Sequence, residues 1–483
     1  MFGAYTYPWS DWLYFGIYTG FILTIIFTVI VVVLENRNPV KSLAWIVVLI
    51  FIPIGGFILY LFFGQQYRHT RMISKRKRRI LQRMSSSTTQ SDETETGNKL
   101  SPESQQQISL GYQLGGTRLT VHNRVEIFTD GESKFNALIE DLEKATDFIH
   151  LQYYIFNNDT LGRTIKAVLS EKARQGVRVR VLYDDVGSWR VKAKFFREMR
   201  KAGIEIKPFF KVSFPQLANK LNYRNHRKVA VIDGKIGYIG GMNIADRYCD
   251  GLSWGIWRDT HARIQGPAVY GLQTAFSIDW SFTTREFLSE ARYYPPVEAS
   301  GDTDIQILTS GPLGEWKEIA MSFLKAIANA RECIYIQTPY FLPTDGLLKA
   351  LQAAALAKVD VRLMVPRHSD SRLLQYASQS YLKDVLRAGI KVYFYEGGFL
   401  HAKSLVIDNE FSTIGSTNFD FRSFDHNFEI NAFMYSPETN ARMKKIFLND
   451  MKQCKRITLS RWKRRPIYTK VVESFVRLMS PIL

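Results

Sequence analysis

Residues 226–243 read HRKVAVIDGKIGYIGGMN, and residues 401–418 read HAKSLVIDNEFSTIGSTN. Each segment begins with a His-x-Lys pair, continues with an apolar run up to an Asp-Gly or Asp-Asn turn, and closes with a second apolar run, small residues and an Asn. Alternating Val, Ile and Ala before such a turn predict a β-hairpin. Because residues i and i+2 of a strand face the same side, each hairpin is expected to present one imidazole beside one ammonium.

The duplication extends beyond these two segments. Ile149 to Gln152 matches Ile334 to Gln337, each after a helical segment, and Val177 to Val181 matches Val359 to Leu363. Buried apolar runs that alternate with amphipathic stretches predict strands and helices in turn. We therefore expect an α/β fold class, with two tandem repeats that form one pseudo-twofold catalytic domain. The first repeat is expected over residues 111–295 and the second over residues 296–483.

If the two repeats fold against each other, their motifs form one composite site. The side chains that would meet there are His226, Lys228 and Asn243 from the first repeat and His401, Lys403 and Asn418 from the second. Two ammoniums and two amides suit the non-bridging oxygens of a phosphodiester, and two imidazoles can divide the roles of nucleophile and general acid. This combination predicts phosphoryl transfer with no metal and no cofactor.

The N-terminal region contains two uncharged apolar runs, Trp12 to Leu34 and Ser42 to Tyr67. Each run is long enough to cross the roughly 30 Å hydrocarbon core of a bilayer as a helix. A cleaved signal peptide does not fit the first run, because no basic residue precedes it and no small-residue cleavage site follows it. We expect residues 1–67 to form a two-helix transmembrane hairpin.

Charge gives the expected orientation and the expected partner. Lys and Arg cluster between Arg68 and Arg83, so the positive-inside rule places the catalytic part on the cytoplasmic face of a multi-pass protein of the cell membrane. The net charge of +19 favours an anionic partner, either lipid or nucleic acid, and the apolar runs favour lipid. Residues 68–110 are expected to form a basic juxtamembrane segment and a flexible polar linker, because residues 84–109 contain few apolar side chains.

The repeated motif resembles the signature of the phospholipase D superfamily, H-x-K-x4-D followed by G-[GS]-x-N, which occurs twice in each catalytic chain. Within that superfamily the chain looks like the bacterial cardiolipin synthases, because a membrane hairpin precedes the catalytic part and the stretch from Glu35 to Trp45 joins its two spans. The resemblance covers nearly the whole chain except the polar linker. It implies two phospholipase D-like repeats, a membrane phospholipid substrate, phosphatidylglycerol, and no nucleic-acid partner.

The resemblance also implies roles for individual residues. His226 is expected to attack phosphorus and His401 to protonate the departing glycerol, which gives a phosphohistidine intermediate and then cardiolipin. Asp259 and Glu429 stand in corresponding places behind the two motifs, and the resemblance assigns Asp259 to His226 and Glu429 to His401.

The remaining signature residues receive structural or binding roles by the same resemblance. Asp233 and Asp408 are expected to be structural residues at the hairpin turns, while Asn243 and Asn418 bind the phosphate. By sequence alone the two histidines are equivalent, so the choice of nucleophile rests on the resemblance.

Several alternatives remain open at this stage. A hydrolytic phospholipase D would use the same site with water as acceptor, a nuclease would use the positive charge, and a decayed domain would act only as a membrane tether. The C-terminal segment from Arg461 predicts an amphipathic helix, either on the membrane surface or packed on the second repeat. An insertion at residues 211–222 of the first repeat is either a lid, a membrane-touching loop or a surface loop.

Overall fold

The computed structural model describes residues 9–34, 39–60, 72–86, 100–211, 223–298 and 301–480. Within these ranges the chain forms an N-terminal helical part and a larger α/β part, which are treated one at a time. Most of the insertion at residues 211–222 lies outside the described ranges.

The N-terminal part contains α1 (Trp9–Leu34), α2 (Pro39–Phe51) and α3 (Pro53–Leu59), and α1 contacts both of the others. In α1 the apolar stretch Trp12–Ile30, 19 residues long, is sufficient to cross a membrane. The second predicted span is not one continuous helix, because Pro53 begins α3 and holds Ile52 outside the helical region at φ −133°. Of the described residues, only α1 is long and apolar enough to span a bilayer, and residues 61–67 lie outside the described ranges.

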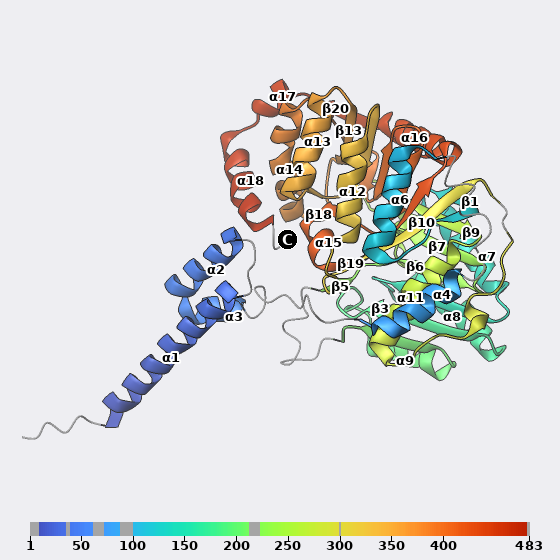
Figure 1. The fold of residues 1–483 in the computed structure, drawn as a ribbon, viewed down its shortest axis with the longest axis horizontal. Coiled ribbons are helices and arrows are strands. Elements are labelled where there is room, and N and C mark those ends of the chain that lie inside the picture. The colour runs from blue at the N-terminus through green and yellow to red at the C-terminus, as the bar shows by residue number, and fades with distance from the viewer. Residues whose placement is uncertain are drawn as a thin grey trace, which may run out of the picture. The chain divides into compact units, whose positions relative to one another are not determined.

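The α/β part is built on a 16-stranded sheet among the described residues. Its strand order is β20-β14-β13-β11-β16-β17-β19-β10-β1-β9-β7-β6-β2-β3-β4, so the repeats meet where β1 pairs with β10. Outward from that pair, β1-β9-β7-β6-β2-β3-β4 of the first repeat has the same arrangement as β10-β19-β17-β16-β11-β13-β14 of the second. The predicted α/β duplication is confirmed, and both repeats share one sheet (Figure 1).

The strands of the first repeat are β1 (Thr120–Phe128), β2 (Phe148–Tyr153), β3 (Arg178–Asp184), β4 (Glu205–Phe209), β5 (Arg224–Asn225), β6 (Val229–Ile232), β7 (Ile236–Gly240), β8 (Ile256–Arg258) and β9 (His261–Gln265). Its helices are α7 (Gly131–Glu143), α8 (Thr160–Arg174), α9 (Ala193–Lys201), α10 (Arg247–Asp250) and α11 (Val269–Thr284), and the 3-10 turn Ala291–Tyr293 follows them.

The strands of the second repeat are β10 (Thr303–Ser310), β11 (Cys333–Gln337), β12 (Phe341–Leu342), β13 (Asp360–Pro366), β14 (Lys391–Tyr395), β15 (Gly398–Leu400), β16 (Ser404–Ile407), β17 (Phe411–Gly415), β18 (Phe419–Asp420), β19 (Asn427–Tyr435) and β20 (Cys454–Ile457). Its helices are α12 (Glu318–Asn329), α13 (Asp345–Leu356), α14 (Arg372–Arg387), α15 (Phe421–Asp425), α16 (Pro437–Met451), α17 (Leu459–Lys463) and α18 (Ile467–Met479).

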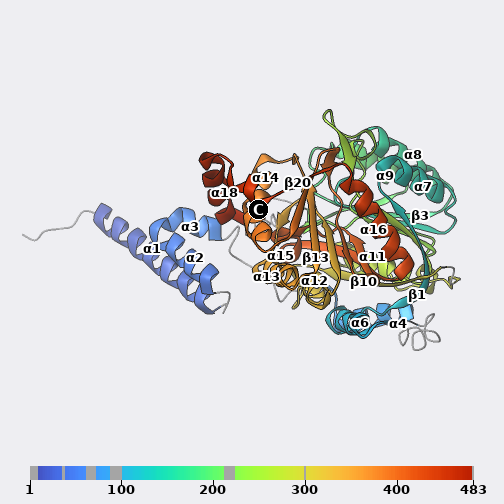
Figure 2. The same ribbon diagram turned by 90° about the horizontal axis from the view of Figure 1, so that it is seen from above.

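Helices cover both faces of the sheet, and the strands alternate between two cores. In β6, Val229 and Val231 join a central core with α11 and α16, whereas Ala230 and Ile232 join a core with α7, α8 and α9. This alternation follows from the two-residue repeat of a strand. The central core contains strand residues of both repeats, and α11 and α16 are seen in Figure 2. The two repeats therefore share one hydrophobic core and fold as a single unit.

The predicted flexible linker is partly wrong. Residues 102–115 form α6 (Pro102–Gly115), which packs on α12 and covers the second part of the predicted linker. The basic segment before the linker forms α4 (Lys75–Ser86), whose Leu81 is fully buried. Ser101 caps α6 by accepting a hydrogen bond from the Ser104 backbone N–H, Pro102 opens the helix, and Gly116 ends it at φ 67°. These end signals stabilise a helix in a segment that has few apolar residues.

Candidate active site

Each motif segment folds as the predicted hairpin, but the His-x-Lys pair lies outside it. The strands β6 and β7 pair antiparallel from Val229 opposite Ile239, and β16 and β17 pair from Ser404 opposite Ile414. The pairs therefore precede the first strand, and the expectation that they share a strand face is wrong. Instead, the ammonium of each Lys turns back and donates to the backbone carbonyl of its own His.

The signature aspartates fasten the hairpin turns to the neighbouring strands. The Asp233 carboxylate accepts backbone N–H groups of Thr146, Asp147 and Phe148 at 2.8 to 2.9 Å, at the start of β2. Asp408 accepts the three N–H groups that begin β11, at residues 331–333, in the same way. Both aspartates adopt a positive φ, 50° and 48°. This geometry supports a structural role for both aspartates: each one ties its hairpin turn to the start of the neighbouring strand.

Two very short strand pairings determine which carboxylate faces which histidine. In the first, β5 of repeat 1 pairs in parallel with β19 of repeat 2, with Asn225 opposite Phe428. The next residue along each strand is His226 and Glu429, and the His226 N–H donates to the Phe428 carbonyl at 3.0 Å. The His226 Nδ1 consequently lies 3.0 Å from the Glu429 Oε1.

The second short pair repeats this arrangement with the repeats exchanged. Here β15 of repeat 2 pairs in parallel with β8 of repeat 1, with Leu400 opposite Arg258, and the His401 N–H donates to the Arg258 carbonyl at 2.7 Å. The His401 Nδ1 therefore lies 2.6 Å from the Asp259 Oδ2. The assignment of Asp259 to His226 and of Glu429 to His401 is wrong, because each histidine takes its carboxylate from the other repeat.

The two histidines line one pocket. It has a volume of about 320 Å³, and its walls include His226, His401, Asn243 and Asn418. Asn243 is already engaged, since its Nδ2 donates to the Tyr248 hydroxyl at 2.6 Å. The Asn418 Oδ1 is buried and has no hydrogen-bond partner in the part of the chain that the structure describes.

Further polar residues in the pocket wall were not predicted. They include Tyr154, Arg224, Arg247, Tyr340, Asp370, Asp420 and Arg422. None belongs to the duplicated motif, so the sequence offered no spacing that would single them out.

Four basic side chains are buried at this site: His226 and His401 line the pocket, and Lys228 and Lys403 are buried two residues further along each motif. Burial holds the pKa of Lys228 well below its ordinary value, and burial lowers the pKa of Lys403 to about 8. Burial likewise lowers the pKa of His226 to about 4, and burial together with Lys403 holds the pKa of His401 well below its ordinary value. A bound phosphate anion would add negative charge beside all four groups and raise these pKa values. The pocket is thus prepared electrostatically for an anion.

The two carboxylates differ in their surroundings. Burial alone would raise the pKa of Glu429, but the facing His226 and Lys228 bring it below the ordinary value, and the Ser416 hydroxyl donates to its carboxylate. Burial raises the pKa of Asp259 to about 6. The position that corresponds to Ser416 is Gly241, where a Cβ atom would lie 2.1 Å from the Asp259 Oδ1. Glu429 therefore has a hydroxyl donor where Asp259 has a glycine.

Behind the pocket lie two buried ion pairs that sequence reasoning missed. Asp279 of α11 accepts from Arg227 at 2.6 Å and from Gln152, and Asp450 of α16 accepts from Arg258 and from Gln337 at 2.7 Å. Gln152 and Gln337 occupy matched places in the repeats, which was the one signal in the sequence. Since Arg227 and Arg258 directly neighbour His226 and Asp259, these networks hold the motif backbone in place.

Replacement of Asp279 by alanine is expected to lower the free energy of unfolding by about 3–5 kcal/mol, because it leaves the Arg227 guanidinium buried without its counter-ion. Denaturant unfolding of the purified chain measures this. Asp345→Ala serves as the control, because Asp345 pairs with Lys349 on the surface and its side chain is 76% exposed. Equal stability of the two variants would contradict the prediction.

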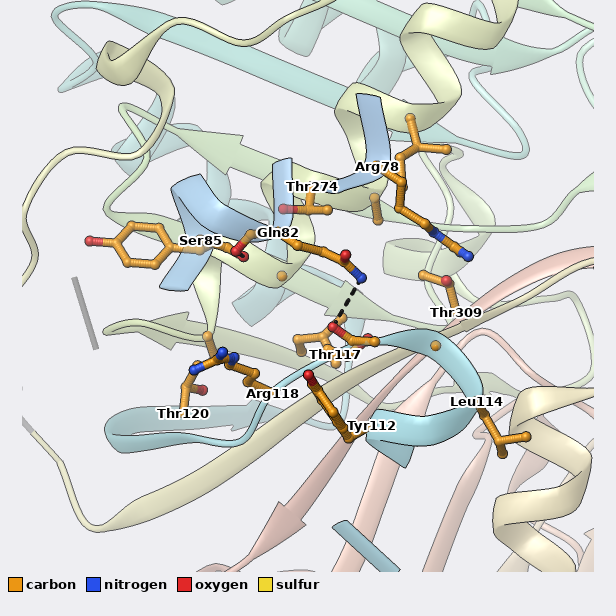
Figure 3. A pocket seen from close by; sticks show the side chains of 18 of the residues that line it. Arg78, Gln82, Ser85, Tyr112, Leu114, Thr117, Arg118, Thr120, Thr274 and Thr309 are labelled. Atoms are coloured by element: carbon orange, nitrogen blue, oxygen red, sulfur yellow. Dashed lines mark hydrogen bonds between the residues drawn. The ribbon is translucent and has the colours of Figure 1, made fainter. Parts of the chain in front are cut away.

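A second cavity of about 500 Å³ lies apart from the predicted site residues. Figure 3 shows it between α4, α6 and α11, with Arg78, Arg118 and Thr274 at its wall and a hydrogen bond from Gln82 to the Gly116 carbonyl. It contains none of the motif residues.

A pseudo-twofold α/β sheet that brings two His-x-Lys motifs to one pocket defines a phospholipase D-like protein. Residues 138–256 and 323–451 match the family described as cardiolipin synthase, PLD-like domain, and residues 22–65 match the phospholipase D-nuclease N-terminal family. The chain belongs to the cardiolipin synthase family.

Relatives along the full length agree with this family. The chain is 41% identical over 470 residues to a cardiolipin synthase of Listeria monocytogenes, across 96% of this chain and 98% of the relative. It is 40% identical over 472 residues to the major cardiolipin synthase ClsA of Bacillus subtilis, across 96% and 98%. The solved structure of a phosphatidylserine synthase from Haemophilus influenzae has the same fold, with a TM-score of 0.60 at 14% identity over 78% of this chain and 99% of that one.

Proposed function

We propose that this chain is a cardiolipin synthase that moves a phosphatidyl group between two phosphatidylglycerol molecules and releases glycerol. The relatives supply the reaction class, since they carry that name along nearly the whole length of this chain. The observation that carries the proposal is the pocket itself. It holds two imidazoles, each fixed by a carboxylate, and two buried lysines stand beside them.

In the first step, the neutral His226 attacks the phosphorus of one phosphatidylglycerol through Nε2. Its Nδ1–H donates to Glu429, which is ionised and so fixes the tautomer that leaves the Nε2 lone pair free. The bond from phosphorus to the glycerol oxygen breaks, and protonated His401 gives its proton to that oxygen. The products are glycerol and a phosphatidyl group bonded to His226.

In the second step, the neutral His401 takes the proton from a hydroxyl of a second phosphatidylglycerol. That oxygen attacks phosphorus, the bond from phosphorus to His226 breaks, and cardiolipin leaves. Lys228, Lys403 and Asn418 offset the charge on the phosphoryl oxygens during both steps. One diester is exchanged for another, so the reaction needs no activated nucleotide and no cofactor.

We further propose that the chain is a multi-pass protein of the cell membrane, with its catalytic part in the cytoplasm. Support comes from the apolar stretch in α1, from the apolar helix Ser42–Phe51 in α2, and from the basic cluster that follows residue 67. In this arrangement α2 and α3 belong to the second crossing.

The test is a product analysis with the purified full chain in phosphatidylglycerol bilayers. Cardiolipin and glycerol are expected in equal amounts. Phosphatidic acid in place of cardiolipin would identify a hydrolytic phospholipase D and overturn the proposal. An inactive protein in which His226→Ala changes nothing would favour a membrane tether.

The pH dependence of kcat/KM is expected to fall on the alkaline side near pH 8. Burial lowers the pKa of Lys403 to about 8, so above that pH the free enzyme loses an ammonium that binds the phosphoryl oxygens. Lys403→Arg keeps its charge to far higher pH and is expected to remove this alkaline limb, although its rate is lower. The measurement is the pH profile of kcat/KM for both proteins in bilayers of fixed composition. If the alkaline limb is unchanged in the arginine variant, a group other than Lys403 causes it.

A further inference from the structure

The helix α18 is amphipathic, but it turns charged residues toward the protein and exposes many of its apolar residues. Its charged side faces the protein: Glu473 is buried and pairs with Arg465 at 2.8 Å, and Arg477 pairs with Asp384 of α14 at 2.7 Å. Among apolar residues of this helix, Val476 is buried in the core of repeat 2. Figure 1 shows α18 beside α14 and α17. These contacts fix which side of α18 is turned outward.

The outward side carries an apolar stripe at helical spacing. Its residues are Tyr468, Val471, Val472, Phe475 and Leu478. The exposed fractions of Phe475 and Leu478 are 68% and 79%. A surface helix normally buries such a stripe and exposes its charges. A continuous exposed apolar stripe on a folded protein marks a surface that another phase or molecule covers.

This stripe leads to the active-site pocket. Ser480, the residue after α18, is buried and lines the pocket that contains His226 and His401. Leu374 of α14, the helix on which α18 packs, lines the same pocket. The apolar stripe therefore lies on a helix whose C-terminal end reaches this pocket.

The charges around the stripe select its occupant. Arg461, Lys463 and Arg464 are exposed at the start of this segment, and Lys470 lies on α18 itself. Two copies of the chain that met through this face would bring two basic clusters together. A bilayer of anionic phospholipid instead offers an apolar interior for the stripe and negative headgroups for the cluster.

We propose that the outer face of α18 docks on the surface of an anionic bilayer, with the stripe below the headgroups, and so places the pocket mouth against the lipid from which substrate is drawn. The docking surface consists of the apolar stripe and the basic residues named above. The inference goes beyond the proposed reaction, because it assigns a membrane contact to the catalytic part itself in addition to the N-terminal helices.

The first test replaces Phe475 with the photo-cross-linking residue benzoylphenylalanine in the full chain, in vesicles of phosphatidylglycerol and phosphatidylcholine. Irradiation is expected to give adducts with the mass of one phospholipid. The matched control carries the same residue at Lys144, a site at the end of α7 that is 66% exposed, and is expected to give no lipid adduct. The same cross-linking experiment is done with the His226→Ala variant. Because that variant is expected to be inactive, lipid adducts in it would support docking whether or not the proposed reaction is correct.

Other cross-linking products would overturn the inference. Dimers linked through position 475 would assign the stripe to a second copy of the chain, and a link within one chain to residues 9–60 would assign it to the N-terminal helices. Absence of any adduct would show that the stripe faces water.

The second test measures the rate with Val471→Ser and Phe475→Ser together. The mole fraction of phosphatidylglycerol that gives half the maximal rate is expected to rise about tenfold, because two apolar side chains no longer partition into the bilayer. Turnover of a dispersed short-chain phosphatidylglycerol is expected to stay the same, as is the melting temperature. Equal loss on both substrates would place the effect in the fold or the pocket and contradict docking.

Discussion

The His226→Ala variant is expected to lose cardiolipin synthesis by at least about three orders of magnitude, the scale found when an enzyme loses its covalent nucleophile. His401→Ala is expected to lose a comparable amount, because both steps of the proposed reaction pass a proton through His401. Overall rates alone therefore do not separate the two histidines.

A phosphatidyl ester of p-nitrophenol separates them. This leaving group departs without a proton, so the first step no longer needs His401. The His401→Ala variant is expected to release a burst of p-nitrophenol equal to the enzyme present and to retain a phosphatidyl adduct on His226. The His226→Ala variant is expected to give no burst. Mass spectrometry of the digested protein locates the adduct.

The structure supplies a reason for this assignment that the sequence did not. Glu429, which faces His226, has a pKa below its ordinary value and receives a hydrogen bond from Ser416, so it stays charged. Asp259, which faces His401, has its pKa raised to about 6 by burial. We propose that the lower pKa of Glu429 keeps its carboxylate charged over a wider pH range than that of Asp259, and that this favours His226 as the nucleophile. A burst in His226→Ala with an adduct on His401 would reverse the assignment.

Local signals were sufficient to predict the hairpins and the duplication. Apolar residues before Asp233-Gly234 and Asp408-Asn409 indicated each hairpin turn, and the same motif, His-x-Lys followed by Asp and Asn, occurred twice. The α/β class followed because each repeat alternates buried strands with helices. These features depend on residues that are neighbours in sequence, where periodicity carries information.

The crossing of the carboxylates depends on contacts that have no local signal. It is set by β5 with β19 and by β8 with β15, strands that pair over two and three residues and join opposite repeats. Strands this short contain no alternation of apolar and polar residues from which the sequence could predict their pairing. Likewise, Asp279 is the one charged residue of α11, and only its contact with Arg227 reveals its role.

The crossed pairing has a kinetic consequence that distinguishes it from the pairing assigned by sequence. Glu429→Gln removes the charge that faces His226 and is expected to slow the p-nitrophenol burst by roughly two to four orders of magnitude, as loss of the carboxylate behind a catalytic histidine does. Asp259→Asn acts on His401 and is expected to leave the burst nearly unchanged.

Asp259→Asn is instead expected to slow the transfer of the phosphatidyl group to the second phosphatidylglycerol, because His401 must then accept a proton without a charged partner. The pairing within each repeat would predict the opposite result, with the burst sensitive to Asp259 and the transfer sensitive to Glu429. Melting temperatures of both variants check that the fold is kept. The Glu429→Gln burst is also expected to stay equally slow when His401→Ala is added, since the Glu429 carboxylate acts on the first step through His226, whose Nδ1 it contacts at 3.0 Å.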